Sequence, residues 1–127
     1  MIVVRSAHDH ATTMRRLTAA VQARGLTLFA LIDHAAAARA AGLELADEQV
    51  LVFGNPQGGT PLMQDDPRIG LQLPLRMLVW LGEDGVSLGY DDPTELADRF
   101  HVAAHAATLQ AMAGQLGELA QTAAAED

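Results

Sequence analysis

The chain has 127 residues, 50% of them hydrophobic and 19% charged, and its 16 Asp and Glu residues outnumber its 8 basic residues. The net charge of −8 argues against a nucleic-acid partner and against binding to an anionic membrane, because both require clustered Lys and Arg side chains. Cysteine is absent, which excludes disulfides, thiol catalysis and iron–sulfur clusters.

Length and hydropathy predict a single soluble domain, which we expect to be cytoplasmic. A chain of this size buries roughly two-thirds of its surface, which is enough for a core without metal or disulfide support. The apolar run 2–4 is too short for a signal-peptide core, and the run 77–81 is too short for a membrane span. We expect the domain to occupy residues 1–120 and the alanine-rich tail 121–127 to be frayed.

The first part of the chain alternates between strand and helix patterns. β-branched residues predict a strand over residues 2–6, and an apolar stripe predicts a helix from about Asp9 to Arg24. The apolar run 26–32 predicts a strand, which is either buried on both faces or half exposed. An alanine-rich helix is then expected over residues 35–41.

The middle of the chain predicts three further strands. Residues 50–53 form an apolar run of strand length, and Thr60-Pro61 has the residue types of an N-cap and first turn for a short helix. Residues 74–81 and 86–90 flank a Gly-Glu-Asp-Gly loop, which is typical of a β-hairpin.

The last part of the chain predicts helices. Asp92-Pro93-Thr94-Glu95 resembles a capping box, so a helix should begin there and break near His101. A final helix is predicted by a stripe with alternating steps of four and three residues. Its members are His105, Leu109, Met112, Leu116 and Leu119. Strands clustered in mid-chain around one clear hairpin favour an α+β fold, a sheet of about five strands covered by helices.

An ordered series of short motifs carries a family resemblance between about Thr12 and His101. The series is Phe29-Ala30-Leu31-Ile32-Asp33-His34, Val50-Leu51-Val52-Phe53-Gly54-Asn55-Pro56, Leu73-Pro74-Leu75-Arg76 and Tyr90-Asp91-Asp92-Pro93. As a set, it resembles the domain of unknown function 302 family. The resemblance implies a TATA-binding-protein-like α+β fold, in the order strand, helix, four strands and helix. It implies neither a nucleic-acid function nor a known reaction.

Asp33 and His34 follow the apolar strand 26–32 and are candidate ligand-binding residues. A carboxylate can orient a neighbouring imidazole for proton transfer or metal ligation. The alternative interpretation is structural, because Asp is a common N-cap and Asp33 stands where the alanine-rich helix should begin.

His101 and His105 are four residues apart, so on one continuous helix their rings would be neighbours at metal-ligand spacing. If the final helices cover the sheet, His101 would approach His34, and the three imidazoles with Asp33 would suit zinc, another divalent metal or haem. The alternative for His105 is a half-buried histidine of the apolar stripe. No particular cofactor is indicated.

Two more polar residues complete the candidate site. Asn55 follows the strand 50–53, and Arg76 is the sole charged residue of the strand 74–81. Both would hold a polar or anionic group, although Asn55 also suits a turn and Arg76 a structural ion pair. Paired acids at 65–66 and 91–92, and the histidines at 8 and 10, are interpreted as solvated residues near helix starts.

These patterns support two functional hypotheses and disfavour a third. The first is a non-enzymatic module that binds a small ligand or metal between Asp33, His34, Asn55, Arg76 and His101. The second is a homo-oligomer, expected as a dimer, that associates through the stripe 109–119 or an open strand edge. A hydrolase using Ser87 is disfavoured because its Gly-x-Ser-x-Gly pattern lies along a predicted strand rather than at a strand-to-helix turn.

Overall fold

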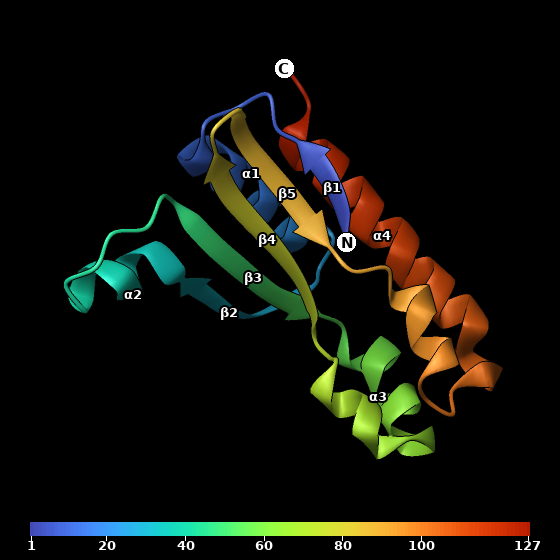
Figure 1. Ribbon diagram of the computed structural model, residues 1–127. Helices are drawn as coiled ribbons and strands as arrows, with labels where there is room; N and C mark the ends of the chain where they lie inside the picture. The colour runs from blue at the N-terminus through green and yellow to red at the C-terminus, as the bar shows by residue number, and fades with distance from the viewer.

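The computed structural model describes residues 1–127, which form one antiparallel sheet with helices against it (Figure 1). The five strands lie in the order β1-β5-β4-β3-β2. Their bounds are β1 Ile2–Arg5, β2 Thr27–Asp33, β3 Glu48–Gly54, β4 Leu75–Gly82 and β5 Gly85–Tyr90. The predicted hairpin is confirmed, because β4 and β5 pair directly through the turn from Gly82 to Gly85.

Two long helices cover one face of the sheet, and the shorter helical segments lie toward its ends (Figure 1). The long helices are α1 His10–Ala23 and α4 Ala106–Ala124. The others are α2 His34–Ala40, α3 Pro56–Asp65 and three short 3₁₀ segments, η1 Pro67–Leu71, η2 Pro93–Asp98 and η3 Ala103–His105. This is the predicted α+β fold with its strand, helix, four strands and closing helix.

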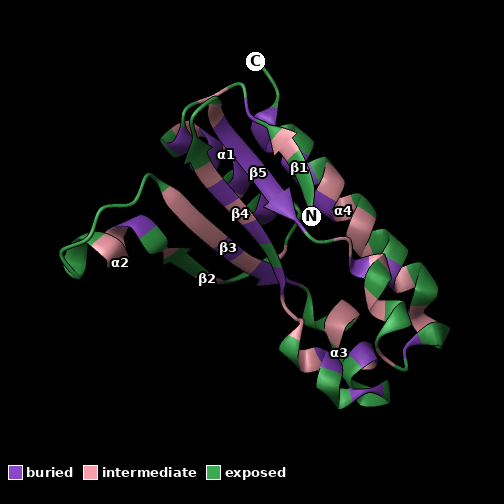
Figure 2. Ribbon diagram, in the orientation of Figure 1, coloured by how far each residue is buried: buried purple, intermediate pink, exposed green.

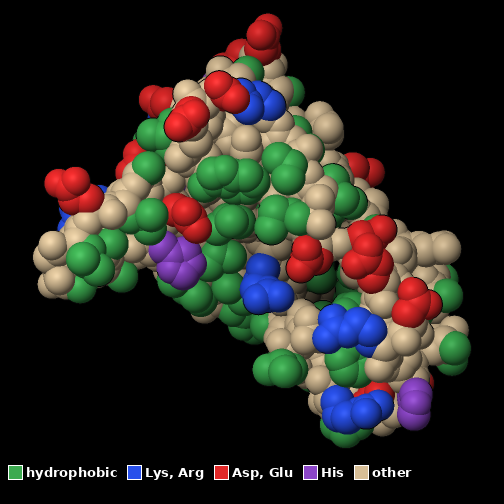
Figure 3. Space-filling view, in the orientation of Figure 1, with side chains coloured by type: hydrophobic (Ala, Val, Ile, Leu, Met, Phe, Trp, Pro, Cys, Tyr) green, Lys and Arg blue, Asp and Glu red, His purple; other side chains and the backbone are tan.

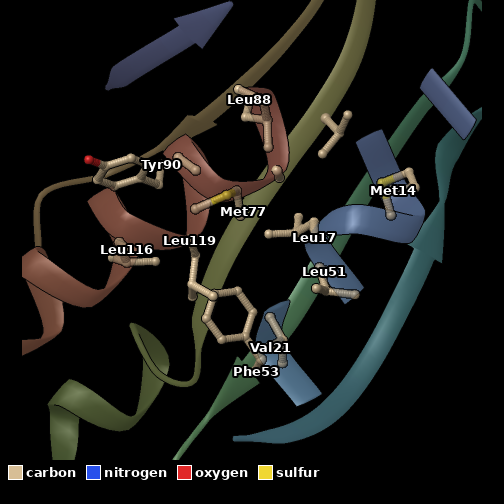
Figure 4. Close-up of a cluster of buried hydrophobic side chains, with 14 of the residues drawn as sticks. Met14, Leu17, Val21, Leu51, Phe53, Met77, Leu88, Tyr90, Leu116 and Leu119 are labelled. Atoms are coloured by element: carbon tan, nitrogen blue, oxygen red, sulfur yellow. The ribbon is translucent and has the colours of Figure 1, made fainter. Parts of the chain in front are cut away.

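The core lies between the sheet and the two long helices because alternate strand residues point to that side. Leu51 of β3 is paired with Met77 of β4, and both are fully buried. Figure 4 shows these side chains meeting Leu17 from α1 and Leu119 from α4. In Figure 2 the buried residues are concentrated on β5 and along the inner sides of α1 and α4.

The apolar stripe of α4 belongs to this core, which argues against self-association through it. Leu109, Leu116 and Leu119 are all buried, and Leu109 joins Leu62 in a second cluster that holds α3 against α4. A stripe that already packs against the sheet and α3 is not available to another molecule.

The opposite face of the sheet carries no helix, and its apolar side chains stay partly exposed (Figure 3). The edge strand β2 is exposed along most of its length, so of the two alternatives for this run burial on both faces is excluded. Ile32 is 46% exposed and faces the same side as Val50 and Leu78 through the strand register. Trp80 also lies on this face.

Two predicted boundaries differ from the structure. Helix α3 begins at Pro56 with Asn55 as its N-cap, so Pro61 lies inside the helix. Helix α4 continues to Ala124, so the prediction of fraying from residue 121 is wrong. The guanidinium of Arg16 donates to the carbonyl oxygens of Ala123, Thr122 and Ala125, which caps this helix end. None of the helices has the length and apolar character needed to cross a membrane.

Candidate ligand-binding cleft

A cleft of about 510 Å³ opens between α3 and α4, at the end of β3. Its floor comes from the chain around Gly54 and Leu75, and its walls include Met63 of α3 and Met112 of α4. Phe29, which is 51% exposed, closes the side nearest β2. This volume falls within the usual range for sites that bind small molecules.

Glycines provide much of the space in this cleft. A Cβ atom at Gly58 would lie 3.4 Å from Cε of Met112, and one at Gly59 would lie 3.6 Å from Cδ1 of Leu73. At Gly54 the nearest atom would be Cβ of Pro74, at 3.7 Å. Each glycine therefore leaves room where a side chain would begin to fill the cleft.

The lining of the cleft contains no charged residue. Its polar side chains are those of Asn55, Thr60, Thr108 and Gln115. Asn55 is already used locally, because its Oδ1 accepts a hydrogen bond from the backbone N–H of Gln57 at 2.9 Å. The arrangement is suited to an apolar molecule with few polar groups, because a charged ligand would lose hydration without gaining a partner.

A second hollow, of about 630 Å³, lies on the uncovered face of the sheet. Ile32, Val50 and Leu78 form part of its apolar floor. Arg76 and His34, two of the predicted site residues, lie at this hollow. In Figure 3 basic and acidic side chains border the apolar middle of this face.

Comparison with known families agrees with this architecture. The family model of the domain of unknown function DUF302 matches residues 2–123, which is nearly the whole chain. The chain belongs to the DUF302 family. A solved structure of an uncharacterized conserved DUF302 protein from Bacillus stearothermophilus superposes with a TM-score of 0.85 at 17% identity, covering 96% of each chain. That likeness supports the fold.

The DUF302 chain also matches parts of longer proteins. It is 45% identical over 102 residues to the fluoride-specific ion channel FluC 1 of Brucella suis biovar 1, covering 78% of this chain and 39% of that protein. The FluC 1 protein of Brucella abortus biovar 1 matches at the same identity, with 37% of its length covered. The matched segment is thus well under half of each relative.

The structure does not bring the five predicted ligand-binding residues of this DUF302 domain into one pocket. His34 and Arg76 border the hollow on the sheet, whereas Asn55 lies at the cleft between α3 and α4. Asp33 caps α2: its Oδ1 accepts from the Ala36 N–H at 2.8 Å, and its Oδ2 accepts from Nε2 of Gln49 at 3.0 Å. The geometry therefore supports the interpretation of Asp33 as a helix N-cap rather than as a ligand-binding residue.

The predicted metal set of His34, His101 and His105 is also not assembled. His34 begins α2 and His105 precedes α4, and these helix starts lie at opposite ends of the molecule (Figure 1). The Nε2 atom of His105 is 2.6 Å from Oδ2 of Asp65. No group of three or more His, Cys, Asp or Glu residues is arranged to hold a metal ion. The break in helix between His101 and His105 removes the i, i+4 geometry on which the prediction rested.

Two buried polar residues were misjudged from the sequence as solvated. His10 is buried, and its Nε2 lies 3.1 Å from the carbonyl oxygen of Val79. The sequence did indicate that His10 is buried, because it stands four residues before Met14 and so lies on the apolar face of α1. Asp66 is only 3% exposed and accepts hydrogen bonds from the Arg68 guanidinium and the His101 N–H. These donors hold the pKa of its carboxyl far below the usual range.

Proposed function

We propose that this DUF302 chain is a non-enzymatic module that binds a small, uncharged and mostly apolar molecule in the cleft between α3 and α4. The observation that carries the proposal is the lining: about 510 Å³ of space bordered by apolar side chains and three glycines, with no charged residue. Asn55 is the one predicted site residue that stays in this proposal.

Physical chemistry supports this ligand class. Burying apolar surface contributes about 25 cal/mol per Å², so a ligand that fills the cleft gains affinity mainly through its apolar area. Thr60, Thr108 and Gln115 offer hydrogen bonds for one or two polar groups of the ligand. Such groups would fix its orientation rather than supply most of the affinity.

The neutral fluorophore N-phenyl-1-naphthylamine provides the direct test. Its emission should rise and shift to the blue when it enters the cleft, and Gly59→Leu should abolish that change because the added side chain fills the space. The matched control is Gly114→Leu: Gly114 is also helical, but a Cβ there meets nothing within 4 Å. Probe binding that survives Gly59→Leu, or is lost equally in both variants, would contradict the assignment.

The matches to fluoride channels favour a second candidate function. Because a segment 45% identical to this chain forms part of proteins named as fluoride-specific ion channels, we propose that the domain acts together with such a channel. The test is to co-express this chain with the unmatched part of the Brucella suis protein and reconstitute both in vesicles. Joint purification with altered fluoride flux is expected, and unchanged flux without co-purification would exclude this role.

A further inference from the structure

The uncovered face of the sheet has the composition of a protein interface. Val50 and Leu78 form an adjacent pair across β3 and β4, and Ile32 of β2 extends the row toward the sheet edge. Trp80 lies one step along β4 on the same side. Aromatic and Arg side chains are enriched at interfaces between proteins, and the buried centre of such an interface is apolar.

Gly89 allows this face to be flat over β5. A Cβ atom there would lie 2.6 Å from Sδ of Met1 and 2.9 Å from Cζ3 of Trp80, so both side chains lie directly on the strand backbone. The indole ring consequently covers β5 instead of projecting from the sheet. The result is an apolar surface beside the hollow, with no element of this chain packed over it (Figure 3).

The charges around this surface are of both signs and are mostly unpaired. Arg76 and Arg99 border the hollow, and neither takes part in any of the five salt bridges of the structure. The acidic residues at the same hollow are Glu48, Asp91, Asp92 and Glu95. Among these only Asp91 has an ionic partner, the N-terminal ammonium at 3.8 Å.

We infer that the uncovered face is an interface with a second copy of this chain, related by a two-fold axis. In a two-fold interface the same surface of both copies meets, so if residue i of one copy contacts residue j of the other, residue j of the first also contacts residue i of the second. A face that carries both unpaired arginines and unpaired carboxylates can therefore pair its positive groups with the negative groups of a second copy. Arg76 of one copy would thereby reach the acidic border of the other, while the two apolar floors pack together.

The size of the face agrees with this partner. The five strands have four to eight residues each. With strands about 4.8 Å apart and a rise of about 3.3 Å per residue, the face is about 24 Å wide and about 13 to 26 Å long. The accessible surface of such a face is of the order that each partner buries in a standard interface, about 800 Å². Two sheets packed in this way lie about 10 Å apart, with their side chains filling the space between them.

Sedimentation equilibrium of the purified chain tests the inference. We expect a species of about twice 13.4 kDa. Leu78→Glu and Arg76→Glu should both shift it to the monomer, with unchanged far-ultraviolet circular dichroism. Arg15→Glu is the matched control: it makes the same change in charge at an exposed position of α1, behind the sheet, and should leave the dimer intact.

Trp80 supplies an independent measurement because it is the only tryptophan in the chain. Its fluorescence should shift to the blue and become less accessible to acrylamide as the protein concentration rises from about 1 µM toward 1 mM, the range that separates tight from weak association. The Leu78→Glu protein should show no such dependence. A monomer throughout this range, or a dimer that survives Leu78→Glu, would overturn the inference.

Discussion

The guanidinium of Arg68 makes a bidentate contact with the buried carboxylate of Asp66: Nε donates to Oδ1 at 3.0 Å and Nη2 donates to Oδ2 at 2.8 Å. The His101 N–H adds a third donor, at 3.0 Å from Oδ2. Asp66 thereby connects η1 with the segment that leads into α4. A carboxylate at this junction links the stability of the fold to pH.

The first prediction concerns acid stability. Because these donors lower the folded-state pKa of Asp66 below the ordinary 3.8, the unfolded chain takes up the proton first as the pH falls. The stabilisation from Asp66 is fully present above about pH 5 and is lost as the pH falls below about 4 toward the folded-state pKa. Urea unfolding from pH 7 to pH 3 should therefore show a difference between wild type and Asp66→Asn that shrinks on acidification.

Asp98→Asn provides the control for this measurement, since Asp98 is exposed at the end of η2. Its unfolding midpoint should follow that of the wild type at every pH. A constant difference between wild type and Asp66→Asn across the whole range would show that the carboxylate contributes through shape rather than charge.

The second prediction concerns Asp33, whose side chain caps α2. Asp33→Ala should lower the free energy of unfolding by about 0.5–2 kcal/mol, because the Ala36 N–H loses its acceptor. Asp33→Ser should recover most of the loss, since a serine hydroxyl also accepts at an N-cap. Thermal unfolding of the three proteins measures both effects, and equal stability of the alanine and serine variants would contradict the capping role.

The third prediction concerns the contact between His105 and Asp65, which joins the end of α3 to the segment before α4. A double-mutant cycle with His105→Gln and Asp65→Asn should give a coupling of about 0.2–1 kcal/mol, as for other partly exposed pairs. The coupling should decrease in 1 M NaCl because salt screens the ionic part of the interaction. A coupling that does not depend on salt would indicate an uncharged hydrogen bond.

The fourth prediction separates core leucines from exposed ones. Leu119 is fully buried against the sheet, so Leu119→Ala should reduce the free energy of unfolding by about 2–5 kcal/mol. Leu71→Ala removes the same atoms from a side chain that is 86% exposed, and its effect should stay within about 0.5 kcal/mol. Chemical denaturation compares the pair, and similar losses at both positions would conflict with the core described above.

The architecture could be predicted because its signals are local. The hairpin follows from a short glycine-containing loop between two apolar runs, and α1 follows from its N-cap at Asp9 and its apolar stripe. The predicted start of α3 at Thr60-Pro61 was wrong because Asn55-Pro56 has the same N-cap and first-turn residue types and is the pair that begins the helix. Only tertiary packing decides between two such signals.

The candidate site could not be predicted as a unit because its members meet through the fold. Asn55, at the end of β3, lies at the cleft, but His34 and Arg76 lie at a different hollow. The glycines at positions 58 and 59 lie within α3 and open the cleft. A cleft between two elements cannot be predicted from hydrophobic periodicity, because that pattern reports only which face of each element is buried.

The Arg16 side chain that caps the end of α4 also determines where an attached group would sit. Because it fastens the backbone around Ala123 and Ala125 to α1, a fluorescent dye or affinity tag joined after Asp127 would emerge on the helical side of the sheet. Labelling there should leave the tryptophan-bearing surface unobstructed. This end of the chain is therefore the natural point for immobilising the protein in surface-based assays.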